Sequence, residues 1–144
     1  DIADTVNSKN IQFEYTSDIS KAVWEKLIMV ASIGSIMCYS NMDAKSTVNE
    51  KLYLSILEGM IIEMTNASIS IGVNIDENYS KDTLKYILNR SENLHSSLKE
   101  DFDQKRPLEV DEILGEAYRT GIKNNVDMPN CKMVYEKLIK FAKI

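Results

Sequence analysis

The side chain of greatest chemical interest in the sequence is Lys26, which stands beside the only tryptophan, Trp24, and ahead of a long apolar run. A lysine that is partly buried can act as an acid in catalysis, because burial lowers its pKa. Lysine also commonly lays its methylene groups along apolar surface and keeps its ammonium in water, and Lys21 and Glu25 place further charges nearby. The residues alone therefore favour a surface position for Lys26 over a catalytic one.

The other candidate groups point to structural roles. His95 is the only histidine, which excludes a multi-histidine metal site and weakens a Ser-His-Asp interpretation, so we expect it to be solvated or locally hydrogen-bonded. The acidic pairs Glu100/Asp101 and Asp111/Glu112 are typical of solvated helix faces. The five glycines form neither GxGxxG nor GxxxxGK. We predict no metal site, and the chain by itself lacks the usual means of holding a dinucleotide.

The composition is that of one globular domain. Hydrophobic residues make up 44% of the 144 residues and charged residues 27%, with a formal net charge of -5. No cluster of lysine and arginine is interleaved with aromatic residues, so we expect neither nucleic acid nor an anionic membrane as a partner. The longest apolar run, Leu27 to Cys38, is shorter than the ~18 residues of a membrane span. The two cysteines, Cys38 and Cys131, are typical of reduced thiols, and we expect a cytoplasmic protein.

Helices must position these groups. Ser17 or Asp18 is expected to cap a helix that starts at Ile19 and, being apolar on all faces from Leu27 onward, runs through the middle of the domain. A second long helix is predicted within residues 46–72, with Gly72 as its stop. The remaining predicted helices lie in residues 79–92, started by Ser80, in 95–103, in 109–125, and in 128–143, opened by Pro129.

Strand-like sequence is limited to residues 11–15 and 73–75, too little to build a sheet. The sequence therefore predicts an all-α bundle of about five to seven helices. Residues 1–16 are expected to be the tail of a preceding segment or a linker, and residues 17–144 a single helical domain. Because the sequence starts at Asp1 without an initiator methionine, we expect it to be part of a longer protein.

An ordered set of short motifs runs through the chain. It begins with W-x-K-L at residues 24–27 and continues with a glutamate nine residues before a glycine, Glu63 and Gly72. The later members are Ser96, Ser97, Leu98, Asp101, Arg106, Pro107, Glu109, Val110, Asp111, Gly115 and Pro129. In this order and spacing, residues 17–141 closely resemble the C-terminal helical domain of the ketopantoate reductase (2-dehydropantoate 2-reductase) family.

The resemblance implies a fold like that of the 6-phosphogluconate dehydrogenase C-terminal domain, in an oxidoreductase whose N-terminal Rossmann domain, absent from this chain, binds NADPH. It implies reduction of a 2-oxo acid, such as ketopantoate to pantoate in pantothenate and coenzyme A biosynthesis. Lys26 falls at the position of the lysine that stabilises and protonates the growing alkoxide. Ser97, with Leu98 beside it, falls at the substrate-binding position, and Glu109 at that of the glutamate that contacts the cofactor.

Several positions depart from the pattern of family members that act on ketopantoate. Val30 and Gly34 stand one and two helical turns after the lysine, where those members carry asparagines. Leu94 replaces another asparagine, with Asn93 one position away, and Asn41 is a displaced candidate for a third. Losing hydrogen bonds to a charged substrate, each worth ~1.5–3 kcal/mol, lowers affinity by orders of magnitude. We therefore expect a smaller or more apolar pocket wall and hypothesise a substrate other than ketopantoate.

A second interpretation is a non-catalytic helical domain for association or dimerisation, whose site has decayed. The placement of Lys26, Ser97 and Glu109 distinguishes the two, because one concave wall holding all three would favour the enzyme and separate faces would count against it. On either interpretation we expect the fragment alone to be inactive, since it lacks the nucleotide-binding half. Removal of that half is expected to expose a surface on which two copies form a homodimer.

Overall fold

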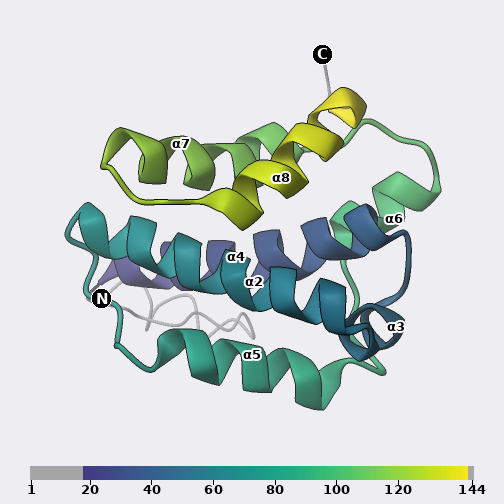
Figure 1. Ribbon diagram of the computed structural model, residues 1–144, viewed down its shortest axis with the longest axis horizontal. Coiled ribbons are helices and arrows are strands. Elements are labelled where there is room, and N and C mark those ends of the chain that lie inside the picture. The colour runs from purple at the N-terminus through teal and green to yellow at the C-terminus, as the bar shows by residue number, and fades with distance from the viewer. Residues whose placement is uncertain (1–17, 143–144) are drawn as a thin grey trace, which may run out of the picture.

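The computed structural model describes residues 18–142, which form a bundle of helices (Figure 1). Its elements in chain order are α2 (Ile19–Ser40), α3 (Ala44–Asn49), α4 (Lys51–Ser70), α5 (Tyr79–Arg90), α6 (Ser97–Asp103), a π-helical segment (Asp111–Gly115), α7 (Glu116–Lys123), α8 (Pro129–Leu138) and a 3₁₀ turn (Ile139–Phe141). These described residues hold seven α-helices and no strand, which confirms the all-α prediction.

The two strand-like segments have different outcomes. The interpretation of residues 73–75 as strand-like is wrong, because they belong to the link between α4 and α5 and have no neighbouring strand in residues 18–142 to pair with. Residues 11–15 lie outside the described part of the chain.

The sequence of α2 explains where this helix starts and how it is buried. Asp18 caps its first turn by accepting a hydrogen bond from the backbone N–H of Lys21 at 3.0 Å. Every residue from Ala31 to Cys38 is buried, as the apolar run predicts, and α2 packs against α4, α6 and α8. By length and composition alone α2 is apolar enough to cross a membrane, but half of that stretch is buried inside the domain, as expected of a central helix.

The chain from Ser46 to Gly72 folds as parts of two helices rather than the single helix predicted. Asp43 caps α3 by accepting from the N–H of Ser46 at 2.8 Å, and Glu50 then takes an extended backbone, with ψ 118°, that separates α3 from α4. After α4, Gly72 adopts φ +88°, a left-handed conformation that glycine takes without strain. The predicted stop at Gly72 is therefore confirmed.

Helices α5 and α6 differ in how they contact α2. α5 begins at Tyr79, one residue before the predicted Ser80, and packs mainly against α4. The Tyr79 hydroxyl donates to the carbonyl oxygen of Glu25 on α2 at 2.5 Å, which ties the start of α5 to α2. α6 packs on α2 and starts after Ser96, whose hydroxyl accepts from the N–H of Lys99 at 3.3 Å.

Helix α8 is fastened to α4 through Glu63, whose side chain is buried. One carboxylate oxygen accepts from the backbone N–H and the side-chain amide of Asn130, at 2.9 and 2.7 Å, and the other accepts from the N–H of Cys131 at 2.8 Å. These N–H groups belong to the first turn of α8, which begins at Pro129 as predicted. Glu63 thus acts as a cap supplied by another helix, with its charge at the positive end of the α8 dipole.

Candidate functional site

A cavity of about 490 Å³ opens between α2, the C-terminal end of α5 and the segment that joins α5 to α6. Its floor is formed by Met29, Val30 and Ile33 of α2, whose side chains carry no hydrogen-bonding N–H or O–H group. The space is left because α5 packs on α4 and is tied to α2 near its own start, through Tyr79. A concave site with an apolar floor and few polar groups is the usual form of a small-molecule site.

The polar rim of the cavity comes from the segment that leads into α6. Asn93 and Ser97 are exposed there, and Ser96 lines the cavity while its hydroxyl caps α6. His95 is also exposed, and its Nε2 lies 3.3 Å from a carboxylate oxygen of Glu100. His95 is therefore locally paired, as expected from the sequence. The groups that the rim leaves open to a ligand are the amide of Asn93 and the hydroxyl of Ser97.

Two further lining residues, Tyr86 and Arg90, were not singled out from the sequence. They stand one turn apart on α5, and the guanidinium carbon of Arg90 lies 3.7 Å from the centroid of the Tyr86 ring. An aromatic residue four positions before an arginine on a predicted helix is a usable signal, because side chains at that spacing meet.

Lys26 lies one helical turn before Val30 on α2, outside the residues that line the cavity. Its side chain is exposed in the described domain, which is the surface position that the residues alone favour. The cause is its place in the first half of α2, where burial is incomplete; continuous burial starts only at Ala31.

The start of α6 approaches α2 tightly at Gly34. A Cβ added at Gly34 would lie 2.8 Å from Oγ of Ser96 and 3.4 Å from Cβ of Leu98. An asparagine side chain has no room there in this arrangement. Gly34 itself does not line the cavity, and Ser96 occupies the space that a larger side chain at this position would need.

The remaining candidate substrate residues are divided between the cavity and other places. Leu98 is 4% exposed and belongs to the hydrophobic core, so its side chain does not line the cavity. Leu94 and Asn93 both line the cavity, so Asn93 can supply the amide group that is missing at Leu94. Asn41 ends α2 with φ 53° and does not line this cavity.

Glu109 precedes the π-helical segment and is exposed, whereas its neighbours Leu108 and Val110 are fully buried. It does not line the cavity beside α2. Of the three residues whose placement was to separate the two interpretations, Ser97 lines the cavity, Lys26 lies one turn before its floor, and Glu109 lies apart from it. Residues 18–142 alone therefore do not bring the three onto one concave wall.

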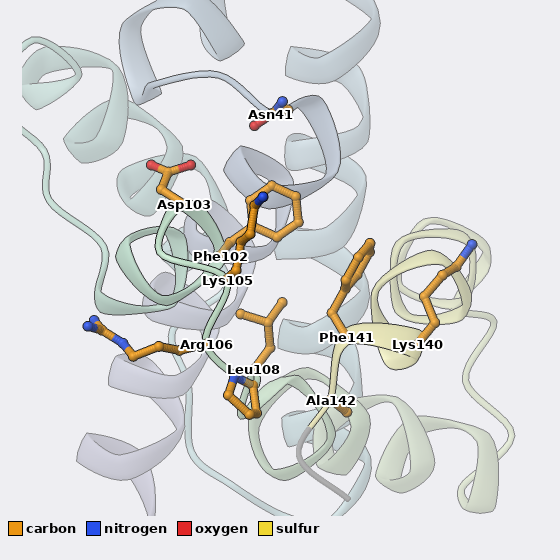
Figure 2. A pocket seen from close by; sticks show the side chains of 10 residues that line it. Asn41, Phe102, Asp103, Lys105, Arg106, Leu108, Lys140, Phe141 and Ala142 are labelled. Carbon is orange, nitrogen blue, oxygen red and sulfur yellow. The ribbon is translucent and has the colours of Figure 1, made fainter.

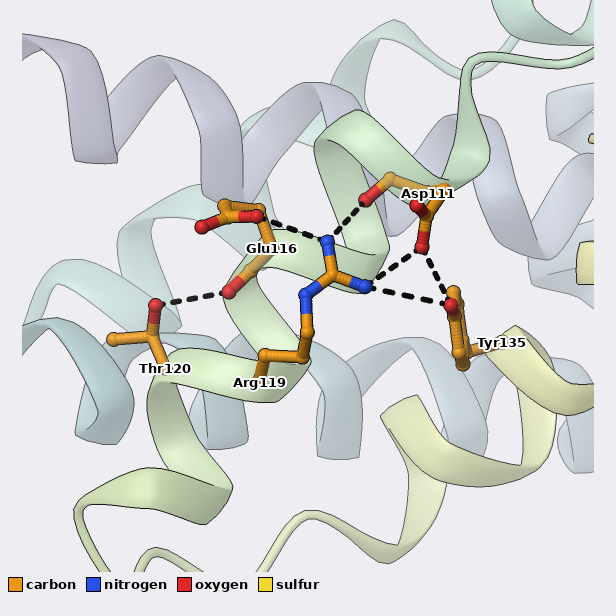
Figure 3. A network of polar contacts seen from close by, with 5 residues as sticks. All are labelled: Asp111, Glu116, Arg119, Thr120 and Tyr135. Atoms are coloured by element: carbon orange, nitrogen blue, oxygen red, sulfur yellow. Dashed lines mark hydrogen bonds and ion pairs between the residues drawn. The ribbon is translucent and has the colours of Figure 1, made fainter. Parts of the chain in front are cut away.

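The helix predicted over residues 109–125 starts as a π-helix and carries a polar network (Figure 3). Asp111 accepts from the Tyr135 hydroxyl at 2.5 Å and from Arg119 at 2.7 Å, and Arg119 also pairs with Glu116 at 2.9 Å. The hydrogen bond from Tyr135, followed by that from Arg119, holds the pKa of Asp111 below its usual value. Asp111 is solvated, as expected of an acidic helix face, and it also joins α8 to α7 through Tyr135 and Arg119.

Gly115 permits this network. A Cβ there would lie 2.7 Å from Oδ1 of Asp111 and 2.8 Å from the ring of Tyr135. Close packing therefore explains why the motif carries a glycine at position 115.

A larger hollow of about 640 Å³ lies beside the C-terminal end of α6 (Figure 2). The rings of Phe102 and Phe141 meet there edge to face, with centroids 5.5 Å apart. Figure 2 shows the side chains of Arg106 and Lys140 directed away from each other, and Arg106 pairs with Asp101. Of the candidate substrate residues the hollow contains only Asn41, so we take the smaller cavity as the candidate site.

The thiols and acids of the described residues form no further reactive centre. Burial raises the pKa of Cys38 to about 12 and, helped by Glu63, also raises the pKa of Cys131. Both thiols are buried and free. Within residues 18–142 no group of three or more His, Cys, Asp or Glu side chains is placed to hold a metal ion.

The fold and the ordered motifs define a known class of protein domain. A family model described as "Ketopantoate reductase PanE/ApbA C terminal" matches residues 18–142, so the chain belongs to this family. Among curated proteins, the 2-dehydropantoate 2-reductase of Nostoc sp. is 23% identical over 137 residues, which are 95% of this chain and 43% of that relative. The chain therefore spans less than half the length of the curated relative that it matches.

Solved structures show the same fold. The ketopantoate reductase of Staphylococcus aureus, described as dimeric, has a TM-score of 0.89 at 21% identity, over 97% of this chain and 49% of that chain. The 2-dehydropantoate 2-reductase of Geobacter metallireducens has a TM-score of 0.84 at 20% identity, over 96% and 46%. A D-mandelate dehydrogenase, solved with NADH and anilino(oxo)acetate, has a TM-score of 0.80 at 16% identity, over 97% and 78%.

Proposed function

We propose that this chain is the helical substrate domain of an NADPH-dependent oxidoreductase that reduces the keto group of a 2-oxo acid, and that Lys26 is its proton donor. One observation carries the proposal: Ser97, from the start of α6, lines the same cavity as Val30, which follows Lys26 by one turn on α2. Family membership and the curated relative support it.

The chemistry assigned to this chain is binding and proton transfer. The dinucleotide, held mainly by an N-terminal Rossmann domain, supplies the hydride to the keto carbon when bound. As negative charge grows on the keto oxygen, the Lys26 ammonium stabilises it and donates one proton from Nζ, which yields the hydroxyl group and a neutral amine. The Ser97 hydroxyl holds the substrate at the rim of the cavity.

Glu109 is proposed to contact the cofactor. Its carboxylate is exposed, and it makes no ion pair within residues 18–142, so it is open to a ligand hydroxyl group. The length of the curated relative supports a further domain for the rest of the dinucleotide. A cytoplasmic location belongs to the same proposal, as does a place in pantothenate biosynthesis if ketopantoate proves to be the substrate.

The test is Lys26→Met in the full-length protein, with Lys21→Met as the matched control. Lys21 lies on the same helix, 3.9 Å from Glu25 and outside the cavity. Loss of a general acid is expected to lower kcat for 2-oxo acids by about 10²–10⁴-fold, whereas the control is expected to keep wild-type kcat. Wild-type kcat in Lys26→Met would overturn the role of Lys26, and failure of the wild-type protein to reduce any 2-oxo acid would overturn the function.

Association is the second candidate function, because α4 leaves Ile62 and Ile69 exposed. These residues are 43% and 47% exposed and stand two turns apart on one helix face. The Staphylococcus aureus ketopantoate reductase is described as dimeric. We propose that this face pairs with a second copy, and sedimentation of Ile62→Asp, compared with wild type, tests it: an unchanged monomer–dimer equilibrium would contradict the proposal.

A further inference from the structure

The α2 side of the cavity is lined by hydrocarbon. Its floor of Met29, Val30 and Ile33 offers a substrate side chain no hydrogen-bond donor. The tight approach of Ser96 to Gly34 excludes a polar side chain from the next turn of the same face. A hydroxyl group placed against this floor, away from the polar rim, would lose hydrogen bonds to water that the floor cannot replace, at a cost in affinity.

One cation, Arg90, lines this cavity without a carboxylate partner in residues 18–142. Arg90 makes no ion pair within residues 18–142, whereas the other two arginines of that part of the chain, Arg106 and Arg119, both do. Its guanidinium is instead held over the ring of Tyr86, 3.7 Å from the centroid. A guanidinium stacked on a ring keeps its N–H edges free, and those edges match the two oxygens of a carboxylate.

The two observations together fit one amphiphilic ligand. A hydrocarbon floor and an unpaired guanidinium at the same cavity fit a molecule with an apolar body and an anionic head. A cavity of about 490 Å³ is also within the size range of small-molecule sites.

We propose that the site takes a 2-oxo acid with a hydrocarbon side chain, whose carboxylate binds Arg90 and whose side chain lies over Met29, Val30 and Ile33. This rests on the proposed function and deepens it, because it assigns Arg90 as a substrate-binding residue and gives the chemical class of the substrate. Ketopantoate, which carries a hydroxyl group, is the disfavoured member of the 2-oxo acids.

The experiment measures kcat/KM of the full-length protein with 4-methyl-2-oxopentanoate, phenylglyoxylate and ketopantoate, in wild type and in Arg90→Met. Methionine keeps most of the length of arginine and removes its charge. Lys85→Met is the control, since Lys85 is an exposed cation of α5 outside the cavity. Phenylglyoxylamide, the uncharged analogue of phenylglyoxylate, separates the effect on the carboxylate from a general loss of activity.

We expect the two hydrocarbon acids to exceed ketopantoate in wild-type kcat/KM by tenfold or more. Arg90→Met is expected to raise KM for those acids by about 10–100-fold, with little change for the amide, because only the acid loses a charge-assisted hydrogen bond. Arg90→Lys should restore part of the loss, and Lys85→Met should change nothing. Equal effects of Arg90→Met on acid and amide, or ketopantoate as the best substrate, would overturn the inference.

A separate measurement distinguishes failure of this inference from failure of the proposed function. If the wild-type protein reduces no 2-oxo acid, the proposed function fails, and ligand-observed NMR with phenylglyoxylate then decides the inference alone. Binding that is present in wild type and lost in Arg90→Met supports the assignment of Arg90. Binding that is absent in wild type, or equal in both proteins, overturns it.

Discussion

Glu63 and Asn130 lie 67 positions apart in sequence, yet one carboxylate oxygen of Glu63 accepts both the backbone N–H and the side-chain amide of Asn130. Gly59, one turn before Glu63, makes this approach possible, because a Cβ there would overlap the amide of Asn130. The pairing fixes where α8 begins on α4. It thereby also positions Tyr135 of α8, whose hydroxyl group donates a hydrogen bond to Asp111.

Replacing Glu63 by Gln tests this cap. The amide group would turn one acceptor into a donor facing an N–H of α8, so a buried charge-assisted contact is lost. We expect the free energy of unfolding to fall by about 2–4 kcal/mol. Urea unfolding followed by circular dichroism measures it, with Glu58→Gln, an exposed change on the same helix, as the control. Equal midpoints for the two variants would contradict the capping role.

Gly34→Asn is expected to destabilise the domain by about 1–3 kcal/mol, because its side chain would displace Ser96 and Leu98 from α2. Ala22→Asn, at an exposed position of α2, is expected to cost only the difference in helix propensity, about 0.7 kcal/mol or less. Thermal unfolding of both variants checks the difference. Full stability of Gly34→Asn would mean that α6 can move away from α2.

Val30→Asn addresses the other missing asparagine, at a position with open space in front of it. The new amide would face the cavity floor and offer hydrogen bonds to a substrate hydroxyl group. On the proposed function, we expect kcat/KM to rise about tenfold for ketopantoate and to fall for hydrocarbon 2-oxo acids. Val23→Asn, an exposed change one turn before Lys26 and outside the cavity, should alter neither. A parallel loss with every substrate would argue against this orientation.

Tyr135→Phe removes the largest cause of the lowered Asp111 pKa. We expect that pKa to rise toward its ordinary value, which a carboxyl-carbon NMR titration measures. A folded pKa below the unfolded value gives stability that is present above the unfolded pKa and lost as pH falls through the folded pKa. The wild-type protein should therefore keep this stability to lower pH than Tyr135→Phe. Identical acid unfolding curves would show that Arg119 alone holds the carboxylate.

The main helices could be predicted because their signals are local. Asp18 as a cap, the apolar faces of α2 and Pro129 at the start of α8 each act within one or two turns. The break at Glu50 was missed because no proline or glycine marks it, and only its extended backbone separates α3 from α4. Prediction therefore succeeded where a few neighbouring residues decide the conformation.

The site was predicted less completely, because its features depend on contacts between distant segments. Ser97 could be assigned by its motif, whereas the tight contact of Gly34 with Ser96 requires α6 to be placed on α2. The exposure of Lys26 depends in the same way on how much of α2 its neighbours cover. The four-residue spacing between Tyr86 and Arg90 is a local pattern that predicts their contact, although neither residue belongs to the family motifs.

The π-helical segment from Asp111 to Gly115 sets the rotational phase of everything that follows it. A wider turn accommodates about one more residue than an α-helical turn, which rotates the next residues by about 100° around the axis. Deleting one residue here would turn Arg119 away from Asp111 and present a different face of α7 to α4. An alignment of this domain with a relative whose helix is regular therefore needs a single-residue gap at this segment, or the faces of α7 will be compared out of phase.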